Sequence, residues 1–109
     1  MRRIFAIRRT KDFRTLFRYG KRRESRYGKI LFLPNNTTSS RFAFITPKTI
    51  DKRSVVRNRI RRRAREWVRK DLTPPSPPFD IAVLFKKESR EATKKDFYED
   101  LAELFHFIF

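Results

Sequence analysis

The chain has 109 residues and a formal net charge of +17 at pH 7, because 29 side chains are Lys or Arg and 12 are Asp or Glu. A chain of this length is expected to form one domain, spanning residues 1–109, and is too small for a large stand-alone enzyme. Cysteine is absent and His106 is the single histidine, which excludes disulfides, thiolate catalysis, Cys/His zinc sites and histidine-based triads.

The first predicted element is a short amphipathic helix over residues 10–19. Thr10 is a candidate N-cap residue, and Gly20 provides a C-terminal stop. The apolar positions between them recur at i, i+3 and i+4, which places Phe13, Leu16 and Phe17 on one face.

Strand-like segments follow this helix. Residues 26–33 and 42–46 are rich in β-branched and aromatic side chains, and the polar run 35–40 joins them. This arrangement predicts an antiparallel hairpin. Residues 21–24 have a weaker strand pattern and would add a short edge strand.

A strongly basic helix is predicted over residues 54–70. At about 100° per residue, an apolar stripe falls within an arc of about 80°. This stripe consists of Val56, Ile60, Ala64 and Trp67. One flank is expected to carry Arg57, Arg61 and Arg65, and the solvent side Asn58, Arg62 and Arg69.

The last third of the chain completes the predicted fold. Residues 73–78 contain four prolines and form an extended connector, and the nearly continuous apolar run 79–85 is typical of a strand covered on both faces. Thr93 and Asp96 suggest a capping box. It opens a helix with the apolar stripe Phe97, Leu101, Leu104, Phe105 and Ile108. The order helix, strands, helix, strand, helix predicts an α+β sandwich.

Positive charge is concentrated in one part of the sequence. Residues 1–70 hold 24 basic and 4 acidic side chains, a balance of +20, whereas residues 71–109 hold 5 and 8, a balance of −3. An anionic partner therefore faces the N-terminal two thirds. No membrane span or secretory signal is recognisable, so we expect a cytoplasmic protein with neither a membrane nor a small molecule as its main partner.

The acidic side chains do not suggest a catalytic site. Four of them lie among basic residues and are predicted to form ion pairs. These are Asp12, Glu24, Asp51 and Glu66. Four others are predicted to form a solvated helix face rather than a metal site. These are Asp96, Glu99, Asp100 and Glu103. With two glycines, the chain also lacks a phosphate-binding Gly-rich loop.

RNA binding is the function that these observations favour. Guanidinium groups match phosphate oxygens in a bidentate manner, and aromatic rings stack on unpaired bases. Phe13 and Phe17 are candidates for stacking, although both could equally be core residues.

The segment from Val55 to Glu66, VVRNRIRRRARE, resembles the RNR motif of the protein subunit of bacterial ribonuclease P. Further similarity lies in KDFRTLFRYG (residues 11–20), RFAF (41–44) and FDIAV (79–83), so the resemblance covers nearly the whole chain. It implies a single-domain α-β sandwich with the order αβββαβα and a left-handed βαβ crossover, a fold that also occurs in a ribosomal protein domain.

The resemblance also implies a function. In this family a catalytic RNA uses Mg²⁺ to remove the 5′ leader of precursor tRNA, and the protein is an RNA-binding subunit without an active site of its own. The implied partners are therefore the catalytic RNA and precursor tRNA, and the Mg²⁺ would be bound mainly by the RNA.

The positions implied to bind the RNAs are the motif residues Arg57, Asn58, Arg59, Arg61, Arg62 and Arg65. Those implied to line the cleft for the 5′ leader are Phe13, Phe17, Lys29, Leu31 and Lys48. Lys29 and Leu31 stand where the family often has apolar or aromatic residues, and the charge of Lys29 departs from that pattern. The sequence also has Lys48 alone where two lysines are usual, and it lacks the glycine that is common before the basic helix.

Two other functions remain open at this stage. One is a structural role as a ribosomal or general RNA-binding protein of the same fold. The other is docking of the basic helix on an anionic membrane surface, which requires Trp67 to insert into lipid rather than pack in the core.

Overall fold

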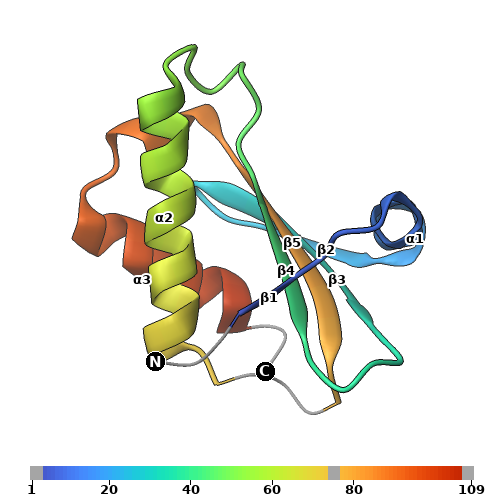
Figure 1. The fold of residues 1–109 in the computed structure, drawn as a ribbon. Helices are drawn as coiled ribbons and strands as arrows, with labels where there is room; N and C mark the ends of the chain where they lie inside the picture. The colour runs from blue at the N-terminus through green and yellow to red at the C-terminus, as the bar shows by residue number, and fades with distance from the viewer. Residues whose placement is uncertain (1–3, 74–76, 107–109) are drawn as a thin grey trace.

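A five-stranded mixed sheet with helices on both faces organises the computed structural model, which describes residues 4–73 and 77–106 (Figure 1). The elements in chain order are β1 (Phe5–Ala6), α1 (Thr10–Tyr19), β2 (Lys21–Glu24), β3 (Gly28–Pro34), β4 (Arg41–Ile45), α2 (Ser54–Asp71), β5 (Phe79–Phe85), the 3₁₀ helix η1 (Lys87–Glu91) and α3 (Lys94–His106). This confirms the predicted α+β class and the three helices. The sequence pattern does not predict the two-residue strand β1 or the helix η1.

The strand order is β1-β4-β5-β3-β2, so the predicted hairpin between β3 and β4 is wrong. Strand β5 lies between them, antiparallel to β3 and parallel to β4, with Val83 opposite both Ile30 and Phe44. The reason is the apolar content of β5. Ile81 and Val83 are fully buried, and a strand of this kind is most stable at the centre of a sheet with neighbours on both edges.

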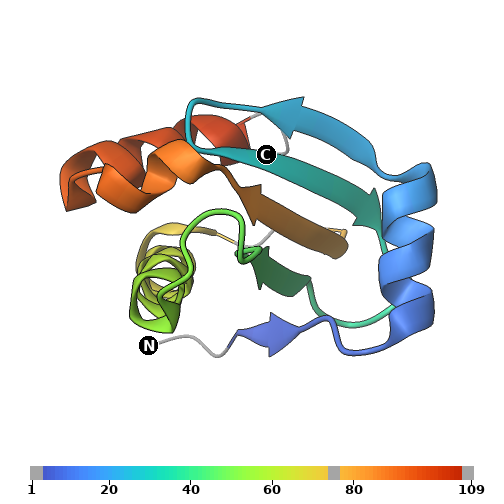
Figure 2. The same cartoon turned by 90° about the horizontal axis from the view of Figure 1, so that it is seen from above.

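The unit β4-α2-β5 connects two adjacent parallel strands. Seen from the side of α2 with both strands pointing upward, β5 lies to the left of β4 (Figures 1 and 2). The crossover is therefore left-handed, as the resemblance implied, and opposite to the usual hand of such units.

Helices α2 and α3 cover one face of the sheet, whereas α1 lies alone on the other (Figure 2). The predicted stripe of α2 is buried in full, and Trp67, only 7% exposed, packs against Phe105 with ring centroids 5.3 Å apart. From α3, Phe97 stacks on Phe85 at 5.5 Å. This packing contradicts insertion of Trp67 into a membrane. The predicted stripe residue Ile108 lies outside the described residues.

The helix ends follow the sequence signals in part. Thr93 Oγ1 accepts a hydrogen bond from the Asp96 backbone N–H at 3.1 Å, which confirms Thr93 as the cap of α3. Thr10 is not an N-cap but the first residue of α1, because Arg9 occupies the cap position. Gly20 ends α1 as predicted, and a Cβ at this position would lie 2.5 Å from the Leu16 carbonyl oxygen.

Within the described residues, no helix is both long enough and apolar enough to cross a bilayer.

Candidate nucleic-acid interface

The turn before α2 is held by a side-chain pair instead of a glycine. Asp51 Oδ1 accepts the Arg53 backbone N–H at 2.9 Å, and Asp51 Oδ2 forms an ion pair with Arg53 Nη2 at 2.9 Å. The side-chain hydrogen bond from Arg53 is the largest cause that holds the pKa of Asp51 well below its ordinary value. Arg57 Nη1 then donates to the carbonyl oxygens of Asp51 at 2.8 Å and Lys52 at 3.0 Å. The turn and the first arginine of α2 thus form one unit.

Arg61 is held in a similar way, one turn further along α2. Its Nη1 donates to Thr46 Oγ1, just after β4, and its Nη2 donates to Asn58 Oδ1. A guanidinium has five N–H donors. The observed bonds therefore restrict the Arg61 side chain and still leave donors for a ligand.

Arg62 and Arg65 are exposed and form no hydrogen bond or ion pair with the part of the chain that the structure describes. Lys48, in the loop that enters α2, is also exposed. We use the term basic flank for the residues of α2 that share this side of the helix. They are Arg57, Asn58, Arg61, Arg62 and Arg65.

Arg59 stands apart from the basic flank. Its Nη2 donates to the Arg90 carbonyl oxygen at 2.8 Å, and its Nε is buried without a partner. Arg63, one turn later, donates to the Ala92 carbonyl oxygen at 3.3 Å. This side of α2 therefore faces η1 and the start of α3. Of the six residues that the motif implies, the structure brings five together and separates Arg59.

The sheet face on the α1 side is only partly covered. Alternating residues of β3, β5 and β4 point to it, and we call it the open face. These residues are Lys29, Leu31, Leu33, Ala82, Leu84, Ala43 and Ile45. Leu16 of α1 is fully buried against Leu31 and Ala82, while Leu33, Ala43, Ile45 and Leu84 are only partly buried. An apolar surface thus remains accessible beside α1.

Phe13 and Phe17 lie on α1 at this surface, and their rings stack with centroids 6.4 Å apart and an interplanar angle of 21°. Phe17 is 37% exposed, so it is not a core residue, and Phe13 is partly buried against the Leu16 cluster. Leu31, which is 2% exposed, belongs to the floor beneath α1. Lys29 lies two residues before Leu31 on the same face and is partly exposed.

The predicted ion pairs of three acidic residues are confirmed. Asp12 pairs with Arg41 at 3.2 Å, Glu24 with Lys86 at 2.9 Å, and Asp51 with Arg53. The hydrogen bond from Lys86 lowers the pKa of Glu24.

Glu66 forms no such ion pair among the described residues. It lies near Tyr98, whose pKa is raised mainly by burial and further by the negative charge of Glu66.

The acidic face of α3 is solvated except at Asp100. The Oδ2 atom of Asp100 accepts hydrogen bonds from Ser25 Oγ at 2.6 Å and from the Tyr27 backbone N–H at 3.2 Å. This carboxylate therefore connects α3 to the turn before β3. In residues 4–73 and 77–106, no three His, Cys, Asp or Glu side chains form a group that could hold a metal ion.

The sequence did not single out several residues of the open face. Ala43, Ile45 and Leu84 have the pattern of ordinary strand residues, and the pattern of β5 predicts a strand covered on both faces. Period-two alternation within β4 could have indicated that Ala43 and Ile45 share a face. The register that brings Leu84 beside Ile45 comes from the pairing of β4 with β5, which the sequence pattern does not contain.

The chain matches known proteins over almost its full length. The family model described as Ribonuclease P matches residues 1–108. The ribonuclease P protein component of Coxiella burnetii is 36% identical over 102 residues, which cover 91% of this chain and 81% of that protein.

Solved structures of RNase P proteins have the same fold as this chain. The RNase P protein from Thermotoga maritima has a TM-score of 0.78 and 27% identity, covering 91% of this chain and 93% of that one. The RNase P protein of Staphylococcus aureus has a TM-score of 0.84 over 97% of this chain and 96% of that chain, but at 18% identity it supports the fold alone.

Proposed function

Because the chain belongs to the family of bacterial ribonuclease P proteins, we propose that it assists removal of the 5′ leader from precursor tRNA by binding both the catalytic RNA and the precursor. The observation that carries this proposal is the presence of two separate RNA-compatible surfaces outside the core. They are the basic flank of α2 and the aromatic pair Phe13–Phe17 beside the open face.

The basic flank is proposed to bind RNA backbone. Arg62 and Arg65 are exposed without protein partners among the described residues, whereas hydrogen bonds hold Arg57 and Arg61 in place. Fixed guanidiniums lose less conformational entropy when they bind phosphate. We assign this flank to the catalytic RNA and the adjoining part of the precursor.

Arg59 takes a different role in this proposal. Its bond to the Arg90 carbonyl oxygen directs it toward η1. Arg59 therefore supports the position of the basic flank by holding α2 against η1, rather than by contacting RNA.

The open face is proposed to hold the single-stranded leader. Phe17 presents an exposed ring, and an aromatic ring binds any unstacked base because every base has a π face. Lys29 adds a positive charge at the same surface for the leader backbone. This combination binds single strands without requiring a particular sequence.

Catalysis is proposed to belong to the RNA. In the described part of the chain, several acidic residues form ion pairs with basic side chains, and no three of them gather into a group that could hold a metal ion. We therefore assign the Mg²⁺ used in phosphodiester hydrolysis to the RNA component. We also propose that the complex acts in the cytoplasm.

The test is multiple-turnover cleavage of a precursor tRNA by a bacterial ribonuclease P RNA at low Mg²⁺, with and without this protein. We expect the protein to restore accurate 5′ cleavage. If it binds both RNAs but restores nothing, a general RNA-binding role on the same fold replaces the proposal.

A further inference from the structure

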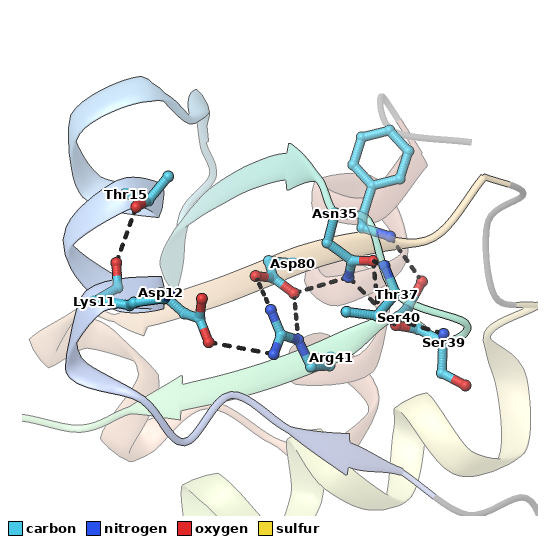
Figure 3. A network of polar contacts seen from close by, with 10 residues as sticks. Lys11, Asp12, Thr15, Asn35, Thr37, Ser39, Ser40, Arg41 and Asp80 are labelled. Atoms are coloured by element: carbon cyan, nitrogen blue, oxygen red, sulfur yellow. Dashed lines mark hydrogen bonds and ion pairs between the residues drawn. The ribbon is translucent and has the colours of Figure 1, made fainter.

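A network of ionic hydrogen bonds joins the start of β4, the start of β5 and the first turn of α1 (Figure 3). Arg41 and Asp80 are directly opposite in the β4-β5 register. Arg41 donates from Nε to Asp80 Oδ1 at 2.8 Å and from Nη2 to Asp80 Oδ2 at 2.7 Å. Its remaining terminal nitrogen, Nη1, donates to Asp12 Oδ2 at 3.2 Å.

The Arg41–Asp80 part of this network is fixed to the sheet. Asp80 is buried and also accepts a hydrogen bond from Asn35 Nδ2 at 2.8 Å. Asn35 in turn is held by Thr37 and by the Ser39 carbonyl oxygen. A bidentate pair with every oxygen satisfied has one well-defined geometry. The hydrogen bonds that Arg41 donates to Asp80 are also the largest cause that raises the pKa of Arg41, so the guanidinium keeps its charge.

Arg41 is therefore not available as a phosphate ligand in the way that Arg62 is. The negative charges of Asp80 and Asp12 balance the positive charge of Arg41, and three of its nitrogens already donate hydrogen bonds to these carboxylates. The guanidinium is a structural connection between the sheet and α1.

The link to Asp12 restrains the orientation of α1. This helix has ten residues, its N-cap Arg9 makes no side-chain cap bond, and its one fully buried side chain is Leu16. Apolar contact holds the helix on the sheet but is non-directional. The ion pair of Asp12 with Arg41 is directional. Asp12 directly precedes Phe13 and lies five residues before Phe17 in the sequence.

We propose that Arg41 and Asp12 are positioning residues that set the rotation of α1, and so direct Phe13 and Phe17 toward the open face. The inference rests on the proposed function of that face in binding the 5′ leader. It assigns to a basic residue and an acidic residue a role in RNA binding that involves no contact with RNA.

The direction in which Asp12→Asn changes the affinity for RNA distinguishes this positioning role from a purely electrostatic role. Asp12→Asn removes a negative charge from an RNA-binding protein, which by charge alone strengthens binding or leaves it unchanged. The positioning role predicts the opposite. With holoenzyme assembled from this protein and a bacterial ribonuclease P RNA, we expect Asp12→Asn to weaken precursor tRNA binding by about two- to fivefold, the scale of a partly exposed ion pair. Affinity for mature tRNA, which lacks the leader, is expected not to change.

Asp96→Asn is the matched control. Asp96 is the third residue of α3, as Asp12 is the third residue of α1, so both substitutions remove one charge from a first helical turn. Asp96 is exposed and has no ion pair among the described residues. This variant is expected to bind precursor and mature tRNA as the wild type does. In a Phe17→Ala background, Asp12→Asn is expected to lose most of its effect, because the two residues act through one element.

Stronger or unchanged precursor binding by folded Asp12→Asn protein would overturn the inference, as would an equal loss for mature tRNA. The ring signals of Phe13 and Phe17 in NMR spectra of the free protein give a readout that does not depend on RNA. We expect Asp12→Asn to shift both signals and Asp96→Asn to shift neither, and unshifted rings would again overturn the inference. If wild-type holoenzyme shows no preference for the leader, the proposed function of the open face fails, and the ring signals alone decide on positioning.

Discussion

The two faces of the sheet are packed in different ways. On one face, α2 and α3 bury a large cluster in which aromatic side chains interlock, including Phe97 at 1% exposure and Trp67 against Phe105. On the other face, α1 alone covers a small cluster around Leu16, and Phe17 remains exposed. The comparison indicates that the first face provides most of the stability and that the second exposes apolar surface for a ligand. An exposed apolar surface lowers stability relative to a buried one, so its aromatic residues are better explained by binding than by folding.

The largest effect is expected from the covered face. Phe97→Ala removes a side chain that stacks on Phe85 and leaves a cavity between α3 and the sheet. We expect a loss of about 3–5 kcal/mol in the free energy of unfolding, measured by urea denaturation. A loss below about 1 kcal/mol would show that the covered face does not dominate stability.

Phe17→Ala on the open face is expected to give the reverse pattern. Because Phe17 is 37% exposed, its truncation should lower the free energy of unfolding by no more than about 1 kcal/mol. Affinity for a precursor with a leader should fall by about 1–3 kcal/mol, the value of stacking on one base, with little change for mature tRNA. Several kcal/mol of lost stability with intact leader binding would place Phe17 in the core and remove the distinction between the faces.

The sequence predicted the parts of this comparison that depend on local pattern. The periodicity of Val56, Ile60, Ala64 and Trp67 identified the buried stripe of α2, and a helical wheel already placed Arg61 beside Arg57. These features follow from helix geometry, which is fixed by neighbours three and four residues apart.

Long-range features could not be predicted in the same way. The pattern of β3 and β4 is equally compatible with a hairpin and with strands separated by β5, because alternation specifies a face and not a neighbour. The partner of Arg59 is a carbonyl oxygen 31 residues away, in a 3₁₀ helix that has no strong sequence signal. The Arg41–Asp80 pair likewise depends on the insertion of β5 beside β4.

A smaller effect is expected on the basic flank, outside both faces of the sheet. The double substitution Arg62→Ala and Arg65→Ala removes two exposed guanidiniums without removing a hydrogen bond within the described structure. Binding to ribonuclease P RNA should weaken, and the slope of log K against log salt should fall by about one for each phosphate that is no longer bound, while stability stays within about 0.5 kcal/mol. Lys87→Ala with Lys95→Ala, an exposed basic pair in the C-terminal part, is the control and should keep the slope. An unchanged slope in the arginine variant would contradict the role of the basic flank.

The smallest effect concerns acid stability and compares an ion pair on each side of the sheet. The pKa values of Asp51, before α2, and Glu24, at the edge of the open face, are both lowered by hydrogen bonds from a cationic neighbour. A lowered pKa contributes stability that is present above the ordinary value of the group and is lost as the pH falls through the folded-state value. The loss should therefore begin near pH 4, the range of ordinary Asp and Glu values. Below that pH the melting temperature should fall less steeply in Asp51→Asn than in the wild type, and this change should be larger than for Glu24→Gln. The reason is that Asp51 accepts both side-chain and backbone hydrogen bonds from Arg53, whereas the more exposed Glu24 forms an ion pair with the Lys86 side chain. Equal flattening in the two variants would show that the turn before α2 and the edge of the open face contribute alike to acid stability.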